Sequence, residues 1–356
     1  LEVNGLWGEN SNLSLKEKKG LLIERQKGNR ELQGIMLGIL RSTKMREKIE
    51  TVVKDIRSMS NDYFEVLILA LLIKVMSLNI QANDMSRILN VKIALDIKFT
   101  SDPNVQEILD FSSGETKFKI RSSVTANAIL QELDCNDTII KVLSRTAEYA
   151  NRYFKTERYE NILKNIISYS HVKTFLTKSG QKEAFLINYY DCLKELDYYK
   201  ENSFYWLQYS IACTNIGKYH LAQTYLDNAY SWFRNSEKIV PFQIDTQQAK
   251  LNLLLIERRK TRDIKGKFIE AHNLLMKPII SSKDNPAKQI ANFQFYIKRE
   301  VKNQLVEGGF EKEYCICCAE AYNKVNNYLK NSNLKQNNYN FTELSTKLLI
   351  CSAESN

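Results

Sequence analysis

The sequence has few of the residues that interrupt helices. Its 356 residues include only 12 glycines and 4 prolines, well below the average usage of globular proteins. Each interior glycine or proline costs a helix roughly 1 or 3 kcal/mol, so this scarcity predicts a mainly α-helical chain. No apolar run reaches the roughly 18–20 residues that span a bilayer, and the longest, at residues 66–75, is broken by Lys74. We therefore expect no membrane segment.

The N-terminus lacks the basic and apolar segments of a secretory leader. The chain opens at Leu1 with a polar stretch, which we interpret as an internal start within a longer polypeptide. Seven cysteines at irregular spacing indicate reduced thiols in a cytoplasmic protein. Cys315, Cys317 and Cys318 lie close together, but a structural zinc site needs a second Cys or His pair at matching spacing. The sequence offers none, so we predict buried thiols and no metal site.

Familiar catalytic motifs are missing as well. No G-x-x-x-x-G-K-[ST] string is present, whose backbone amides would hold phosphates, and no G-x-G-x-x-G fingerprint occurs. His171, His220 and His272 are far apart in sequence, and we expect each of them at the surface or on a helix flank. No serine nucleophile elbow or Cys-His pairing stands out. We predict that the chain is not catalytic by itself and binds no cofactor of its own.

The positive charge is concentrated after residue 150. The whole chain has a net charge of +10. Residues 1–150 contain 21 Lys and Arg against 20 Asp and Glu, a net charge of +1, so +9 belongs to the remainder. A clustered surplus of this size attracts nucleic acid or an acidic protein. Spread over many helices it is a solvated surface, which is the interpretation we favour.

The apolar pattern changes along the first third of the chain. Residues 1–60 are predicted to be a helical segment, and residues 61–135 form a second region. There, Asn61 and Asp62 are expected to cap a strongly apolar helix. Two shorter helical runs follow before residue 110.

A β-hairpin is predicted near residues 108–121. Strand-like runs at 108–111 and 118–121 flank a Ser/Gly turn, and helices followed by a hairpin give the order of a winged-helix-like module. The candidate third helices, 91–97 and 104–109, are apolar or acidic, whereas a DNA recognition helix presents Arg, Lys, Asn or Gln to base edges. We therefore favour a packing or regulatory module over a DNA-binding one.

The clearest motif is a helical hairpin of the tetratricopeptide (TPR) type at residues 204–230. Its template asks for a large residue on the first helix, a small one four positions later, a glycine at the turn, and small or apolar residues along the second helix. This segment meets those demands with Trp206, Ser210, Gly217, Tyr219, Ala222, Leu226 and Ala229. We predict structural packing roles for all seven.

One such hairpin cannot bury its own faces, so we expect neighbouring hairpins to stack on it. The helical pattern predicts two further pairs, residues 246–258 with 267–276 and residues 290–306 with 311–329. Residues 136–356 are thus expected to form an irregular TPR-like α-solenoid, with a groove that holds a protein ligand.

Tyrosine is abundant in this region, and it is common in binding hot spots. The partner-binding candidates are Tyr189, Tyr190, Tyr205 and Tyr209. Packing between repeats is the alternative role for these aromatic rings, and we favour it.

The order of helical segment, winged helix and degenerate TPR array resembles the C-terminal two-thirds of a bacterial STAND-type P-loop NTPase of the antiviral-defence kind. The strings that carry the resemblance are GNRELQGIMLG at residues 28–38, FKIRSSVTANAIL at 118–130, YWLQYSIA at 205–212 and QIDTQQA at 243–249. The resemblance covers most of the chain, but both Walker motifs are missing from it.

This resemblance implies an effector domain and an ATPase core before Leu1, and it places any ATP and Mg²⁺ in that missing core. The winged helix would pack on the nucleotide site, with Arg121 as the nucleotide-contact candidate. A surface hairpin arginine is the alternative role for Arg121 and the one we favour. The TPR-like half would sense a phage protein, and binding would trigger homo-oligomerisation and effector activity.

Three functions stay open at this point. The first, which we favour, is the regulatory and sensor region of an antiphage STAND-type NTPase. The second is a stand-alone TPR-type adaptor or peptide receptor. The third is a winged-helix transcriptional regulator, which the nearly neutral charge of residues 1–150 disfavours because DNA binding relies on phosphate neutralisation.

Overall fold

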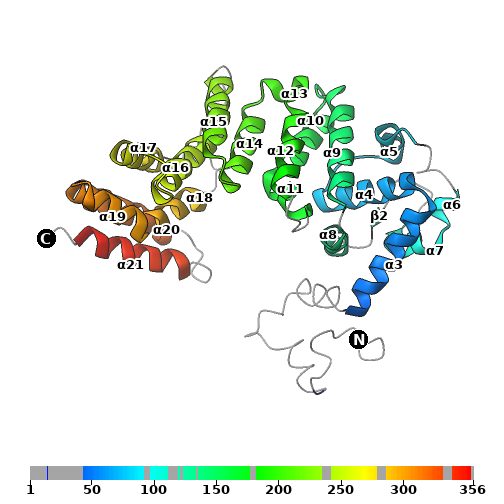
Figure 1. The fold of residues 1–356 in the computed structure, drawn as a ribbon, viewed down its shortest axis with the longest axis horizontal. Helices are drawn as coiled ribbons and strands as arrows, with labels where there is room; N and C mark the ends of the chain where they lie inside the picture. Colours follow the sequence, from blue (N-terminus) through cyan, green and yellow to red (C-terminus); the bar gives the residue numbers. More distant parts are fainter. Residues whose placement is uncertain are drawn as a thin grey trace. The chain divides into compact units, whose positions relative to one another are not determined.

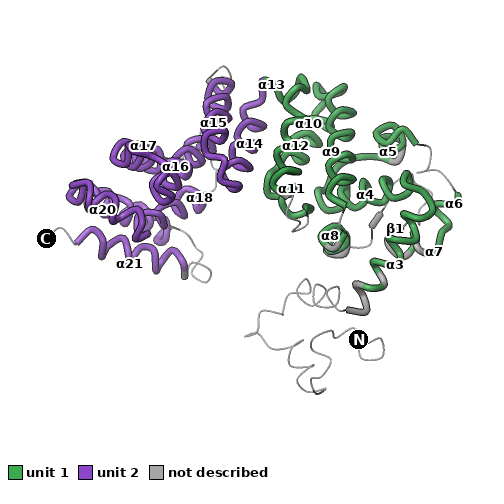
Figure 2. Tube along the Cα trace, viewed as in Figure 1, with its two compact units in different colours: residues 1–200 green, residues 201–356 purple. Residues whose placement is uncertain are grey.

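The computed structural model is mainly α-helical (Figure 1). It describes Ser14 and residues 43–91, 97–110, 119–120, 123–133, 135–176, 182–234, 242–278, 286–331 and 339–353. The chain forms two compact units, Leu1–Lys200 and Glu201–Asn356 (Figure 2). Among the described residues, no helix combines the length and the apolar character that a membrane span requires.

The first unit is built around an apolar helix. This helix, α4 (Asn61–Met76), packs on α3 (Thr43–Met59), and most of its side chains are buried. Its N-cap is Ser60, whose hydroxyl accepts a hydrogen bond from the backbone N–H of Asp62 at 3.1 Å. The expected caps, Asn61 and Asp62, are instead the first residues of the helix, because the hydroxyl of the preceding serine already satisfies a first-turn N–H.

Short elements follow α4. They are α5 (Ala82–Leu89), α6 (Ile97–Thr100), α7 (Pro103–Ile108), β1 (Leu109–Asp110), β2 (Lys119–Ile120) and α8 (Ser123–Glu132). β1 pairs with β2 in antiparallel register, with Leu109 opposite Ile120. The two strands lie within the predicted strand runs at 108–111 and 118–121. The turn predicted between them lies outside the described residues. Both β2 and α8 lie against α4.

The first unit continues past residue 135. Its remaining helices are α9 (Asn136–Asn151), α10 (Glu157–Ile166), α11 (Tyr169–Phe175), α12 (Lys182–Leu193) and α13 (Asp197–Lys200). α9 packs on α4 and α5 on one side and on α10 and α12 on the other. The expected boundary between residues 135 and 136 therefore falls inside a packed unit, because the buried face of α9 joins the two sets of helices.

The second unit consists of paired helices. They are α14 (Ser203–Asn215), α15 (Tyr219–Arg234), α16 (Phe242–Glu257), α17 (Ile264–Met276), α18 (Pro286–Ile290), the 3₁₀ helix η4 (Ala291–Phe295), α19 (Arg299–Glu307), α20 (Glu311–Asn331) and α21 (Tyr339–Ala353). The most extensive packing joins α14 with α15, α16 with α17, and α20 with α21. The second of these is the expected pair at 246–276.

The last expected pair is wrong in its partners. Residues 290–306 do not form one helix, because the chain turns after η4 at residues 296–297 and restarts at Arg299 as the short helix α19. The long helix α20 instead packs mainly on α21, while it also contacts α17, α18 and α19. One apolar core unites these elements with α16, and it includes the four cysteines Cys315, Cys317, Cys318 and Cys351. These thiols are buried as predicted, whereas Cys192 in the first unit is exposed.

Candidate partner-binding region

The α14–α15 hairpin is closed by small residues. Ser210 and Ala222 are fully buried where the helices cross, and the Ser210 hydroxyl donates a 2.8 Å hydrogen bond to the Ala222 carbonyl. Gly217, in the turn, has φ +77°, and a Cβ there would meet no atom within 4 Å. Glycine is therefore favoured by its left-handed backbone and not by lack of space.

The other predicted packing residues line the same hairpin. Leu226 and Ala229 are fully buried on α15, while Trp206 and Tyr219 are half-buried. The Trp206 ring stacks on Tyr225, with ring centroids 5.6 Å apart. The described geometry thus brings all seven residues into one hairpin, with the small ones at its interior.

The four tyrosines expected at a partner surface are buried instead. In the first unit the Tyr189 hydroxyl donates to the Ile166 carbonyl at 3.0 Å and the Tyr190 hydroxyl donates to the Ile167 carbonyl at 2.8 Å. Burial raises the pKa of Tyr189, so its hydroxyl stays protonated as a donor. In the second unit Tyr205 and Tyr209 are core residues. The rings of all four fill helix interfaces, which is the alternative role that we favoured.

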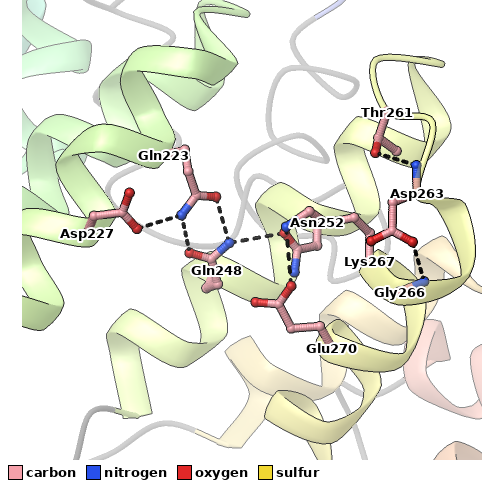
Figure 3. Close-up of polar contacts among 9 residues, drawn as sticks. All are labelled: Gln223, Asp227, Gln248, Asn252, Thr261, Asp263, Gly266, Lys267 and Glu270. Carbon is pink, nitrogen blue, oxygen red and sulfur yellow. Dashed lines mark hydrogen bonds and ion pairs between the residues drawn. The ribbon is translucent and has the colours of Figure 1, made fainter.

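A seam of buried amides joins α15 to α16. Gln223 and Gln248 exchange two hydrogen bonds, each 2.9 Å long, through their side-chain amides (Figure 3). The Gln248 amide also donates to Asn252 Oδ1 at 3.0 Å, and Gln223 donates to Asp227 at 2.9 Å. Gln248 and Asn252 are buried, so these bonds replace water that both side chains lost on folding.

The seam continues along α16 to a buried carboxylate. Asp245 is only 5% exposed and accepts hydrogen bonds from the Tyr230 hydroxyl at 2.7 Å and from Lys277 Nζ at 2.8 Å. Tyr230 belongs to α15 and Lys277 follows α17, so this one carboxylate connects three helices. We call Gln223, Asp245, Gln248 and Asn252 the polar seam.

Sequence reasoning did not single out the polar seam. Its α16 members, Asp245, Gln248 and Asn252, are spaced by three and four positions, which puts them on one face of the helix. A polar stripe with this spacing along one face of the helix was the available signal. Polar residues at such spacing more often face water, so their burial depended on the position of α15, which the sequence of α16 does not contain.

His272 is a second correction. It was expected at the surface or on a helix flank, but it is 4% exposed and its ring joins three elements. Nδ1 lies 3.0 Å from the Tyr296 hydroxyl and Nε2 lies 2.8 Å from a Glu320 carboxylate oxygen. If Nε2–H donates to Glu320, then Nδ1 accepts from Tyr296. This network holds α17 against η4 and α20 and leaves no imidazole nitrogen for a substrate.

The first unit has its own buried carboxylates. Glu65 on α4 accepts hydrogen bonds from Lys141, from Arg145 at 2.8 Å and from Asn61 at 3.3 Å. Asp84 on α5 accepts from the Tyr149 hydroxyl at 2.8 Å, from the Gln81 backbone N–H at 3.1 Å and from Arg158. Both networks fasten an early helix to the later helices α9 or α10, which explains why the first unit extends beyond residue 135.

The pKa of Asp84 shows that the network outweighs burial. Desolvation raises the pKa of this carboxyl, but the hydrogen bonds from Gln81, Tyr149 and Arg158, together with the Arg158 charge, hold it below its ordinary value. Asp84 is therefore ionised in the folded protein at neutral pH. Its role is to hold α5 against α9 and α10.

The buried networks around Glu65, Asp84, Asp245 and His272 join helices to one another. Arg121, the nucleotide-contact candidate, lies outside the described residues. Comparison with protein-family models, with curated proteins and with solved structures gives no match to this chain. The helices and their exposed residues therefore indicate the function.

We expect Gln248→Leu to lower the free energy of unfolding by about 1–3 kcal/mol, because it leaves Asn252 Oδ1 buried without its donor. The double variant Gln248→Leu/Asn252→Leu removes both buried partners and should be less destabilised than Gln248→Leu alone. Urea unfolding of the wild type, Gln248→Leu, Asn252→Leu and the double variant measures these differences and tests their additivity. A double variant with fully additive losses would contradict the pairing of these two amides.

Proposed function

We propose that this chain is a protein-recognition region in which the helical hairpins of residues 201–356 act as a TPR-like array that binds a protein ligand. The observation that carries this proposal is the polar seam, which fastens α15, α16 and the end of α17 to one another. Hairpins fastened in this way present their exposed side chains at fixed spacing. Binding to such a preorganised surface costs little conformational entropy.

The resemblance to STAND-type NTPases extends this proposal. Residues 61–135 are then a winged-helix-like regulatory module, and an ATPase core and effector outside this chain bind ATP and Mg²⁺. Arg121 is the nucleotide-contact candidate in that assembly, with a surface hairpin arginine as its alternative role. The ligand is a phage protein met in the cytoplasm, and its binding drives homo-oligomerisation. The antiparallel β1–β2 pairing beside α4 and α8 supports the module.

The proposal predicts that the full chain, purified through an affinity tag from phage-infected bacteria, retains one viral protein that uninfected cells do not supply. The same two proteins, purified separately, should then form a complex of defined stoichiometry in calorimetry. Hydrogen exchange of that complex should show new protection within residues 201–356, because the recognition surface lies there. The uninfected sample is the control for nonspecific retention.

Other outcomes would count against the proposal. Protection confined to residues 43–200 would move recognition away from the hairpin array. A ligand from the host that binds equally well in both samples would favour the stand-alone adaptor. Retention of duplex DNA that decreases steeply with salt would favour the transcriptional regulator.

A further inference from the structure

The turn between α16 and α17 carries the densest run of positive charge in the second unit. Four cationic side chains, Arg258, Arg259, Lys260 and Arg262, occupy five positions, and all are exposed. Arg259 has φ +52°, and the Lys260 N–H returns to the Leu255 carbonyl at 2.8 Å. These features end α16 in a tight, hydrogen-bonded turn that holds the four side chains together. We call these four residues the basic turn.

The basic turn is not neutralised by its neighbours. Within the part of the chain that the structure describes, none of its four side chains makes an ion pair, whereas nearby Lys298 pairs with Glu257 at 2.8 Å and Lys267 with Glu270 at 3.2 Å. The carboxylate next to it, Asp263, accepts the Gly266 N–H at 2.9 Å. Glu257, Glu270 and Asp263 are therefore engaged with other groups, and none of the three pairs with the basic turn.

The start of α17 does not add a phosphate cradle to this charge. Asp263 caps the helix with its own carboxylate (Figure 3). Glycine at position 266 leaves room for this cap, since a Cβ there would force the Asp263 carboxylate to shift. A negative group already occupies the positive end of the helix dipole, so an external anion is held by the arginine and lysine side chains alone.

The neighbouring turn limits how far the positive surface extends. Lys265 lies over the ring of Phe310, 5.3 Å from its centroid, which brings the α19–α20 turn beside the basic turn. Around Phe310, the side chains of Glu307, Glu311 and Glu313 are exposed. A nucleic acid presents a phosphate charge about every 1.7 Å of duplex, and it would meet these carboxylates. A short acidic peptide segment fits a positive surface of this limited extent.

We propose that the basic turn docks an acidic segment of the protein ligand, rich in Asp and Glu, through salt bridges to Arg258, Arg259, Lys260 and Arg262. This inference rests on the proposed function, because it names the chemistry of the ligand. Arginine is suited to the role, since its guanidinium can hold a carboxylate through two parallel hydrogen bonds. Unpaired charges of one sign also steer an oppositely charged partner and speed its association.

The test uses the full chain and a fluorescent poly-glutamate peptide of about twelve residues, a length that is short compared with a protein interface. The variant Arg258→Gln/Arg259→Gln/Lys260→Gln/Arg262→Gln should weaken binding by about tenfold or more, as the sum of four exposed ion pairs. The matched control is Lys218→Gln/Lys288→Gln/Lys330→Gln/Lys347→Gln, which removes four exposed lysines scattered over the unit. Both variants lower the net charge from +10 to +6. The control should change affinity by less than about twofold, because scattered charges are screened beyond a Debye length.

Three results of this peptide-binding test would overturn the inference. One is the absence of peptide binding by the wild-type chain near physiological salt, and another is an equal loss in both variants. The third is tighter binding of a short DNA duplex than of the peptide, with the loss again at the basic turn. If a captured viral protein binds the basic-turn variant unchanged, the inference fails while the proposed function stands. If the peptide binds at the turn but no protein ligand exists, the proposed function fails and the acidic-peptide site stands.

Discussion

Replacing Tyr209 with alanine should lower the free energy of unfolding by about 3–5 kcal/mol, the range for removing a buried aromatic ring. Tyr209 on α14 is 1% exposed, and its ring stacks on Tyr225 of α15 with centroids 4.0 Å apart. A second ring, Tyr205, lies 6.3 Å away on the same helix. Alanine would leave a cavity between α14 and α15, whose crossing is held by the Ser210–Ala222 hydrogen bond, so the site can collapse only in part. Denaturant unfolding followed by circular dichroism measures the loss.

The matched control for this variant is Leu221→Ala on α15. Leu221 belongs to the same hairpin but is 37% exposed, so its truncation should cost less than about 1 kcal/mol. If Tyr209 were a surface residue that contacts a partner, its substitution would weaken partner binding and leave stability nearly unchanged. A Tyr209→Ala protein as stable as the Leu221→Ala control would thus contradict the buried, stacked position.

This pair of substitutions also shows what the sequence could predict. The hairpin at residues 204–230 was predictable because its turn needs a residue tolerant of positive φ, which Gly217 supplies, and its crossing needs small side chains, which Ser210 and Ala222 supply. The exposure of the tyrosines could not be predicted from the sequence. A tyrosine is amphipathic and serves either a core or a surface, and its position along the helix does not reveal where the next helix lies.

The predicted boundary at residue 135 does not coincide with the division into two compact units, for a related reason. The change in apolar pattern there is real, since a short-element region gives way to successive helices. However, a unit is defined by contacts between residues far apart in sequence. Glu65 with Lys141 and Asp84 with Arg158 are separated by 76 and 74 positions. Nothing in the local spacing of either carboxylate identifies its cationic partner.

Less of the candidate site than of the fold could be predicted from the sequence. The basic turn could have been found from the four cationic residues among positions 258–262. The absence of ion pairs to it among the described residues could not have been predicted, because it depends on Lys298 binding Glu257 and on Asp263 capping α17. A charge run in sequence becomes a docking surface only when the fold leaves it uncompensated. Arrangement in space therefore decides between the solvated surface that we expected and a site.

Replacing Arg158 with methionine should cost about 3 kcal/mol of unfolding free energy at pH 7, near the lower end of the range for breaking a buried ion pair. The Asp84 carboxylate is 9% exposed and would lose its only ion-pair partner among the described residues, although Tyr149 and Gln81 still donate to it. The cost stays near the lower end because the Arg158 side chain is 28% exposed in the folded protein. The variant also removes the 2.8 Å hydrogen bond from Arg158 Nε to the Asn79 carbonyl.

The pH dependence separates the charge effect from this lost hydrogen bond. In the wild type the pKa of Asp84 is depressed on folding, so its stabilising contribution is present above the ordinary value of 3.8 and is lost as the pH falls through the folded pKa. Without Arg158, burial raises the pKa of Asp84 with less opposition. The difference in unfolding free energy between the two proteins should therefore be full at pH 7 and shrink below pH 3.8, where the carboxyl becomes neutral.

Urea unfolding of both proteins at several pH values measures this convergence, with Arg152→Met as the matched control. Arg152 is an exposed arginine of the same unit, and its substitution should change stability by less than about 0.5 kcal/mol at every pH. A deficit for Arg158→Met that stays constant as the pH falls would assign the whole effect to packing and the Asn79 hydrogen bond. A deficit that shrinks identifies Asp84 as the buried charge that depends on Arg158, and so identifies the contact that joins α5 to α10.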